Sequence, residues 1–220
     1  MRIRLIIFDF DGTLGDTRAN IVCTMQQTMA AMDYPVAGEE AIAATIGLPL
    51  EDCFVQLLPG LSPEGKKRCA AVYREIFEKN RKLLVPQLFP HVRETLLQLQ
   101  EQGIVMTVAS SRSSRSLNEF LQEMGIAAYI SYVLGADNVA KAKPDPEPVL
   151  QTLREMGFTA DETLVVGDMP VDIEMGRRAA AHTCAVTWGN AGRDQLQQSG
   201  AEFLIDDIRE LPGLLFLKTD

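Results

Sequence analysis

Two aspartates, Asp9 and Asp11, stand one residue apart directly after the apolar run at residues 5–8 and just before Gly12. If the chain stays extended through Phe10, alternate side chains share a face, so both carboxylates point to the same side. Carboxylates that close repel each other, and both stay charged only beside a cation. The spacing indicates either a hard metal ion with oxygen ligands or two carboxylates that divide acid and base work. Taken alone, the pair could also be ordinary turn acids, because Asp and Gly are common where strands end.

Polar side chains also follow three later apolar segments, at the point where each segment ends. They are Ser110, Ser111 and Arg112 after residues 104–109, Lys141 and Lys143 in the loop after residues 130–134, and Asp168 and Asp172 after residues 163–166. Each alone has a structural explanation: a helix cap, a solvated loop cation or a turn acid. Because ligands of open parallel sheets bind at the carboxyl ends of the strands, we expect these side chains to converge. Their combination suits a divalent cation together with a phosphate.

The elements that must position these residues follow from an alternation of helical and strand patterns that begins at residue 92. Gly103, Gly125 and Gly157 each end an expected helix, which is the position that glycine favours. The alternation predicts right-handed crossovers and a parallel sheet, that is, an α/β core of the Rossmann-like kind. The expected strands lie at residues 5–8, 104–109, 130–134, 163–166, 183–186 and 203–205, and the expected helices at residues 92–102, 113–124, 145–156 and 171–181.

Residues 17–84 show helical periodicity and no convincing strand. Asp16 or Thr17 is expected to cap the first helix, and Ser62 a later one, with Pro63 in its first turn. Shorter helices are expected at residues 39–45 and 50–58. The sequence therefore predicts an α/β core at residues 1–16 and 85–220 and an inserted all-helical domain at residues 17–84.

Composition and charge argue against several classes of function. The 220 residues carry a net charge of −9 with a pI near 4.8, which disfavours nucleic acid or an anionic membrane surface as the main partner. No apolar stretch approaches the roughly 18 residues needed to span a bilayer, and the first residues do not resemble a signal peptide. The four cysteines lack C-x-x-C spacing, so we expect buried free thiols and a reducing, cytoplasmic location.

Two other kinds of site are rejected from the sequence. The histidines, His91 and His182, have no partner at metal-ligand spacing, so zinc chemistry lacks its parts. The segment from Gly60 to Lys67 imitates a phosphate-binding G-x-x-x-x-G-K-[ST] loop, but Lys67 replaces the hydroxyl that would hold magnesium. No strand precedes this segment, and a helix is expected to begin inside it, so it is not interpreted as a nucleotide site.

Four ordered groups of residues resemble the motifs of the haloacid dehalogenase-like hydrolase superfamily. They are Asp9-Phe-Asp11-Gly-Thr13, the hydroxyl of Ser110, Lys143-Pro144, and Gly167-Asp168-Met-Pro-Val-Asp172. The match covers essentially the whole chain, and the helical insert lies where that superfamily places a small cap domain. The resemblance implies a Rossmann-like core with a helical cap, in the branch of phosphoglycolate phosphatases and β-phosphoglucomutase.

The resemblance also implies a role for each site residue. Asp9 resembles the nucleophile that accepts the phosphoryl group, and Asp11 the general acid that protonates the leaving alcohol and then activates water. Mg²⁺ would be held by the carboxylates of Asp9 and Asp168 and by the backbone carbonyl of Asp11, with Asp172 supporting the metal site or orienting Lys143. The expected phosphate- and substrate-binding residues are Ser110, Ser111, Arg112 and Lys143.

The function expected from these residues is Mg²⁺-dependent hydrolysis of a small phosphorylated metabolite through an aspartyl-phosphate, similar to that of phosphoglycolate phosphatases. The protein is expected to be a monomer or weak dimer. Dehalogenases of the superfamily have no aspartate at the position of Asp11, which disfavours dehalogenation. Two alternatives stay open: a phosphosugar mutase of the β-phosphoglucomutase type, and a non-catalytic regulator that binds Mg²⁺ or phosphate. Gly47 and Leu48 in the insert and Arg112 at the rim are candidate specificity contacts.

Overall fold

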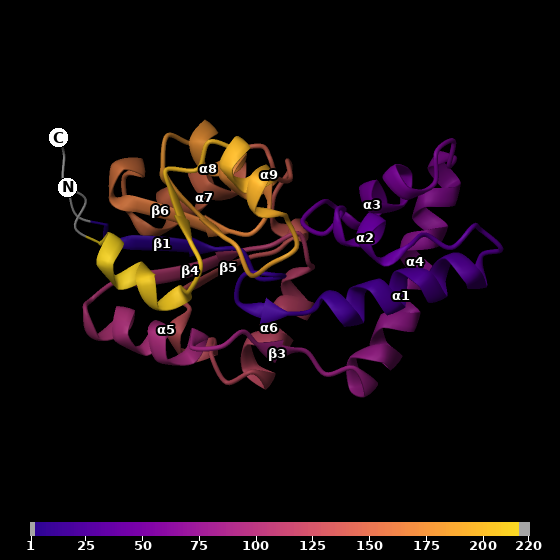
Figure 1. Ribbon diagram of the computed structural model, residues 1–220, viewed down its shortest axis with the longest axis horizontal. Coiled ribbons are helices and arrows are strands. Elements are labelled where there is room, and N and C mark those ends of the chain that lie inside the picture. The colour runs from indigo at the N-terminus through magenta and orange to yellow at the C-terminus, as the bar shows by residue number, and fades with distance from the viewer. Residues whose placement is uncertain (1–2, 216–220) are drawn as a thin grey trace.

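A six-stranded, all-parallel sheet forms the centre of the molecule, which a computed structural model describes for residues 3–215 (Figure 1). The strand order is β5-β4-β1-β6-β7-β8. Because β4 and β6 lie on opposite sides of β1, the order reverses at the first strand. The strands are β1 (Leu5–Phe8), β4 (Val105–Ala109), β5 (Tyr132–Leu134), β6 (Thr163–Gly167), β7 (His182–Val186) and β8 (Phe203–Ile205). The predicted α/β parallel sheet is confirmed, with strand ends that shift by at most two residues.

Helices cover both faces of this sheet (Figure 1). Ile6 and Phe8 of β1 pack in one apolar cluster with residues of α5 and α6, whereas Leu5 and Ile7 pack in a second cluster with residues of α7 and α8. All four β1 side chains are fully buried, which explains why the strand reads as an unbroken apolar run. The helices are α5 (Val92–Glu101), α6 (Ser114–Glu123), α7 (Glu147–Met156), α8 (Pro170–Arg178) and α9 (Arg193–Gln198), with short 3₁₀ turns η1 (Ala127–Tyr129), η2 (Ala136–Asn138), η3 (Ala160–Glu162) and η4 (Ile208–Leu214).

A helical segment is inserted between β1 and β4 and extends away from the carboxyl ends of the strands (Figure 1). The Ser62 hydroxyl caps its longest helix by accepting a hydrogen bond from the Gly65 amide (3.0 Å), as predicted. This helix begins inside the segment that imitates a nucleotide-binding loop, in agreement with the rejection of that motif. The helices are α1 (Arg18–Ala31), α2 (Glu39–Ala43), α3 (Leu50–Leu57) and α4 (Pro63–Leu83).

One local prediction for this segment was wrong, and one short element beside it was not predicted. Thr17 occupies the N-cap position of α1, but its side chain caps nothing, because the hydroxyl donates instead to the carboxylate of Asp11. A short antiparallel ladder was not predicted: β2 (Gly15–Asp16) pairs with β3 (Gln87–Leu88). These strands flank the helical segment on both sides, so the ladder ties its two connections together. The exact division at residues 16/17 and 84/85 stays a prediction.

All four cysteines are free thiols. Cys53, Cys69 and Cys184 are buried free thiols as expected, whereas Cys23 is free but only partly buried. Among residues 3–215, no helix is both long and apolar enough to cross a membrane.

Candidate active site

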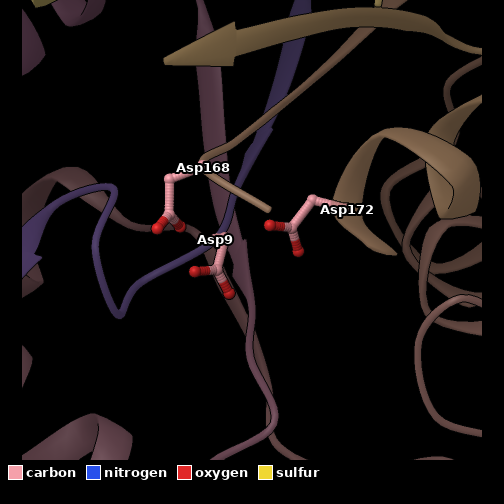
Figure 2. A group of neighbouring side chains, drawn as sticks. All are labelled: Asp9, Asp168 and Asp172. Atoms are coloured by element: carbon pink, nitrogen blue, oxygen red, sulfur yellow. The ribbon is translucent and has the colours of Figure 1, made fainter. Parts of the chain in front are cut away.

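Three buried aspartates meet at the carboxyl edge of the sheet (Figure 2). Asp9 directly follows β1, Asp168 directly follows β6, and Asp172 lies in the first turn of α8. One carboxylate oxygen from each lies within 4.8 Å of the others, and the exposed fractions of the three residues are 5%, 0% and 0%. The predicted convergence of these acids, which are separated by about 160 positions in the sequence, is therefore present in the structure.

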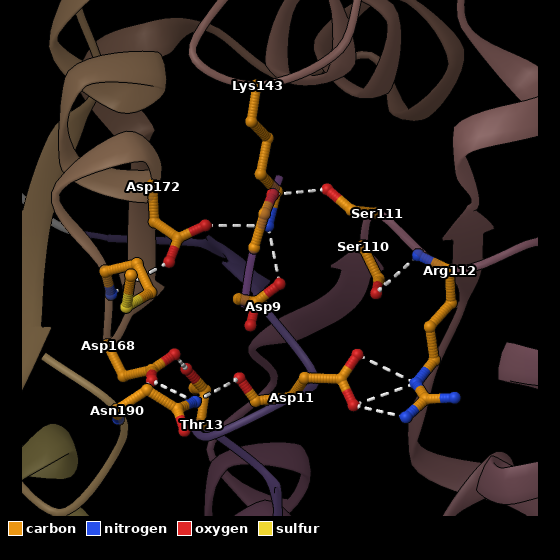
Figure 3. Close-up of polar contacts among 12 residues, drawn as sticks. Asp9, Asp11, Thr13, Ser110, Ser111, Arg112, Lys143, Asp168, Asp172 and Asn190 are labelled. Carbon is orange, nitrogen blue, oxygen red and sulfur yellow. Dashed lines mark hydrogen bonds and ion pairs between the residues drawn. The ribbon is translucent and has the colours of Figure 1, made fainter. Parts of the chain in front are cut away.

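Lys143 is the cation that lies between two of these acids (Figure 3). Its Nζ donates to Oδ1 of Asp9 at 2.5 Å and to Oδ1 of Asp172 at 2.7 Å, and its side chain is only 3% exposed. Burial alone would lower the pKa of Lys143, but the carboxylates of Asp172 and Asp9 more than offset this and raise it above its ordinary value. The ammonium group is therefore held charged beside both acids.

The carboxylates of this cluster repel one another. Burial is the largest cause of the strongly raised pKa of Asp9, and Asp172 and Asp168 raise it further while Lys143 opposes them. Burial, followed by the charge of Asp172, raises the pKa of Asp168 from its ordinary 3.8 to about 7. Burial and the neighbouring carboxylates thus disfavour the charged forms of Asp9 and Asp168, and Lys143 only partly offsets this at Asp9.

The donor set fits a divalent cation. Buried carboxylate oxygens within a few ångströms of one another are the hard ligands that Mg²⁺ prefers, and a cation there would relieve their mutual repulsion. Asp9, Asp168 and Asp172 could supply carboxylate ligands. The carboxylate of Asp11 lies outside this group, although its backbone carbonyl, the atom that the resemblance assigns to the metal, accepts a long hydrogen bond (3.5 Å) from Nδ2 of Asn190.

Asp11 points toward the opposite side of the site from Lys143 (Figure 3). β1 ends at Phe8, so the extended run that would place both carboxylates on one face does not continue as far as Asp11. The Asp11 carboxylate accepts hydrogen bonds from Oγ1 of Thr17 (2.6 Å) and from Nε of Arg112 (2.7 and 2.8 Å). Asp9 and Asp11 thus bind different side chains, so they can have different chemical roles.

The loop after β4 brings the predicted serines and arginine to the same edge, but with partners that the sequence did not reveal. Ser110 is buried, and its hydroxyl accepts a hydrogen bond from the amide of Arg112 (3.2 Å). The Ser111 hydroxyl donates to the carbonyl of Gly47 at 2.5 Å, which joins the helical segment to the core beside the site. The guanidinium of Arg112, expected at the rim, is instead held on Asp11 with a side chain 10% exposed.

Asn190 and Thr13 contribute to the site, although the sequence interpretation gave neither residue a role of its own. The Asn190 amide and its Nδ2 both donate to Oδ2 of Asp168, at 2.7 and 2.9 Å, and Oγ1 of Thr13 donates to Oδ1 at 3.1 Å. Thr13 belongs to the first motif, and Asn190 follows β7. The sequence did carry a signal for Asn190, because this residue follows β7, whose carboxyl end lies at the same edge of the sheet as those of β1 and β6.

Glycine is required where the turn after β1 approaches Asp168. Gly12 has φ +90°, and a Cβ there would lie 2.2 Å from Oδ2 of Asp168 and 2.3 Å from Nδ2 of Asn190. Any side chain at this position would displace the Asp168 carboxylate.

Comparison with known proteins finds relatives along nearly the whole chain. The family model for haloacid dehalogenase-like hydrolases matches residues 6–186. A protein named "Probable phosphatase IndB" from Dickeya dadantii is 38% identical, covering 95% of this chain and 92% of its own length. The pyrophosphatase PpaX of Oceanobacillus iheyensis is 32% identical (96% of each chain), and a phosphoglycolate phosphatase of Vibrio cholerae is 29% identical (95% of each).

Solved structures show the same fold. A haloacid dehalogenase-like family hydrolase from Streptococcus pneumoniae superposes with a TM-score of 0.85 at 21% identity, covering 96% of this chain and 97% of that one. A hydrolase from Pseudomonas syringae superposes with a TM-score of 0.84 at 23% identity, covering 94% and 95%. The family model and the 38% identical relative confirm the predicted superfamily and enzyme class: the chain belongs to the haloacid dehalogenase-like hydrolase family.

Proposed function

We propose that the protein is a Mg²⁺-dependent phosphatase that hydrolyses a small phosphomonoester through a covalent phosphoryl-aspartate at Asp9. The observation that carries the proposal is the buried carboxylate of Asp9 at the carboxyl edge of the sheet. It lies beside the Lys143 ammonium on one side and the Asp168 carboxylate on the other. Phosphoryl transfer depends mainly on positioning and charge neutralisation, which this arrangement provides.

In the first displacement, a carboxylate oxygen of Asp9 forms a bond to phosphorus while the bond from phosphorus to the ester oxygen breaks. Asp11 donates a proton to the departing alcohol oxygen. Ser110 and Lys143 bind the phosphoryl oxygens, and Lys143 offsets the repulsion between the anionic nucleophile and the anionic substrate.

In the second displacement, Asp11 takes a proton from a water molecule, whose oxygen attacks the phosphorus of the phosphoryl-aspartate. The bond between phosphorus and the Asp9 oxygen breaks, which releases inorganic phosphate and restores both carboxyl groups. When bound at Asp9, Asp168 and the Asp11 carbonyl, Mg²⁺ supplies positive charge that neutralises the phosphoryl oxygens.

The inserted helical segment acts as a cap that excludes water and contacts the leaving group. Its loop between α2 and α3 reaches the core at Gly47, whose carbonyl accepts from the hydroxyl of Ser111. Because Ser111 is the neighbour of Ser110, this contact lies directly beside the phosphoryl site. Gly47 is therefore the cap residue that we assign to the substrate side of the site.

Phosphate release from a panel of phosphomonoesters tests the proposal. Since relatives of the chain include phosphoglycolate phosphatases, the panel contains phosphoglycolate, a hexose phosphate and p-nitrophenyl phosphate, each with Mg²⁺ and with EDTA. Asp9→Asn should abolish turnover while the circular dichroism spectrum stays unchanged. The matched control is Asp161→Asn, an exposed acid of η3 at the opposite end of β6, which should retain full activity.

Each alternative predicts a different result. A phosphosugar mutase would convert the hexose phosphate to an isomer without releasing inorganic phosphate. A non-catalytic regulator would bind Mg²⁺ and hydrolyse none of the three compounds. Wild-type turnover in the Asp9→Asn variant would refute the mechanism itself.

A further inference from the structure

The segment that follows β7 lies against the turn that follows β1, and two of its side chains reach backbone carbonyls of that turn. Nε1 of Trp188 donates to the carbonyl of Thr13 at 3.1 Å. Two residues later, Nδ2 of Asn190 donates to the carbonyl of Asp11 at 3.5 Å. The stronger of the two contacts comes from Trp188, a residue to which the proposed mechanism gives no role.

The indole of Trp188 is held in place by a second contact. Its ring packs against that of Phe89, with 6.5 Å between centroids and 59° between the ring planes. Phe89 lies between β3 and α5, in the second connection of the helical segment to the core. The backbone amide of Phe89 donates to the carbonyl of Leu14 at 3.0 Å. The indole therefore contacts both the turn after β1 and a segment that is itself bonded to this turn.

Thr13 connects Trp188 to the acids of the candidate metal site. Thr13 is fully buried, and among residues 3–215 no group other than the indole donates to its carbonyl. Its hydroxyl donates to Oδ1 of Asp168 at 3.1 Å (Figure 3). Gly189 lets the segment lie this close, because a Cβ there would be 2.2 Å from Cβ of Asp168. One residue thus links the indole to a carboxylate of the site.

We propose that Trp188 is a positioning residue: its indole N–H fixes the turn after β1, so that the Thr13 hydroxyl and the Asp11 carbonyl keep their places beside the metal-binding acids. This inference rests on the phosphatase function proposed above, in which Asp168 and the Asp11 carbonyl hold Mg²⁺. Groups that orient metal ligands contribute to metal affinity although they do not touch the metal. Loss of the N–H leaves a buried carbonyl without its donor, and we expect Mg²⁺ to bind more weakly.

A purely structural role for Trp188 predicts a different result. The N–H of a buried tryptophan usually has a hydrogen-bond partner, whatever the function of the protein. If the bond to Thr13 did only this, its loss would lower the melting temperature of the metal-free protein and leave the response to Mg²⁺ unchanged. The experiment must therefore measure Mg²⁺ binding separately from stability.

Trp188 is the only tryptophan among the 220 residues, so an analogue supplied to a tryptophan-requiring host replaces this one side chain. 3-Benzothienylalanine has nearly the same shape as tryptophan but carries sulfur in place of the N–H. 7-Azatryptophan retains the N–H and is the matched control. Trp188→Phe is a second variant without the N–H, and it needs no analogue.

The measurement is the Mg²⁺ concentration that raises the melting temperature of each protein by a fixed interval above that of its own metal-free form. We expect the benzothienyl protein and Trp188→Phe to need about 10-fold more Mg²⁺ than the wild type. This is the lower end of the effect of groups that orient metal ligands, because Trp188 acts through Thr13. The azatryptophan protein should match the wild type. At saturating Mg²⁺, the KM for p-nitrophenyl phosphate should stay unchanged in all of these proteins.

The outcomes separate this inference from the phosphatase proposal. A wild-type response to Mg²⁺ in the benzothienyl protein and in Trp188→Phe would overturn the positioning role, even if both melt at a lower temperature. Equal weakening in the azatryptophan protein would show that the N–H is not the group responsible. A wild-type melting temperature that does not respond to Mg²⁺ would overturn the inference together with the metal site. Failure to hydrolyse any phosphomonoester, with the expected shifts in Mg²⁺ binding, would refute the phosphatase function and leave the role of Trp188 supported.

Discussion

Lys143 is the side chain whose removal should affect the stability of the site most clearly, because it is the cation between two buried acids. Lys143→Met keeps a side chain of similar length but leaves Asp9 and Asp172 without the ammonium that contacts them at 2.5 and 2.7 Å. Removing one partner of a buried ion pair costs about 3–5 kcal/mol, because an uncompensated charge stays behind. The Lys143 side chain is only 3% exposed, so water cannot replace the lost contacts. We therefore expect the free energy of unfolding to fall by about 3–5 kcal/mol, without a reduction for solvent screening.

The free energy of unfolding of the metal-free protein is measured by urea titration, and its melting temperature by heating, both monitored by circular dichroism. A loss of about 3–5 kcal/mol corresponds to a melting temperature lower by roughly 6–20 °C for a chain of this size. Mg²⁺ should recover part of the loss, because it supplies positive charge to the same acids.

Lys141→Met is the matched control for this experiment. Lys141 is two residues away, 71% exposed, and 3.7 Å from Asp145, so its removal should change the free energy of unfolding by less than about 1 kcal/mol. Equal stability losses for the two variants, or a Lys143→Met protein as stable as the wild type, would refute the reasoning that the buried acids depend on Lys143.

Two further predictions concern the acids and their supporting residue. The folded-state pKa of Asp168, about 7, lies above its ordinary 3.8, so its contribution to stability is present below about pH 4 and is lost as the pH rises to about 7. The metal-free protein should therefore melt at a lower temperature at pH 8 than at pH 5, and saturating Mg²⁺ should remove this difference; a melting temperature that rises over this range without metal would contradict the assignment. Asn190→Ala removes the side-chain donor that holds Oδ2 of Asp168 and should weaken Mg²⁺ binding about 10–100-fold, measured as the Mg²⁺ concentration needed to raise the melting temperature. Unchanged Mg²⁺ dependence would show that the Asn190 amide does not orient the ligand.

The sheet and the convergence of its strand ends could be predicted from the sequence because both depend on strong local patterns. β1 is an apolar run buried on both faces, and Gly103, Gly125 and Gly157 end their helices with positive φ as expected. Parallel strands share one carboxyl edge, so residues that follow different strands meet there regardless of their separation in sequence. This reasoning placed Asp9 and Asp168 correctly.

The interactions that the sequence did not reveal depend on side-chain direction and on very short elements. The β2–β3 ladder has two residues on each side, which is too short for any periodic pattern. The Thr17 hydroxyl could have bonded either to the backbone at the start of α1 or to the Asp11 carboxylate. Only the structure shows that it bonds to Asp11. Arg112 was recognised as a site residue, but its placement on Asp11 between Phe77 and Phe120 requires the helical segment and the core to be packed together.

The central claim is that Asp9 carries the phosphoryl group during turnover. The most direct measurement is acid quenching of the enzyme during steady-state hydrolysis with Mg²⁺, followed by mass spectrometry of the peptide that contains Asp9 and Asp11. The account predicts one phosphoryl group on this peptide, located at Asp9, present with substrate and absent in the Asp9→Asn variant. The claim would be contradicted by an active enzyme in which this peptide is not phosphorylated and another residue carries the phosphoryl group.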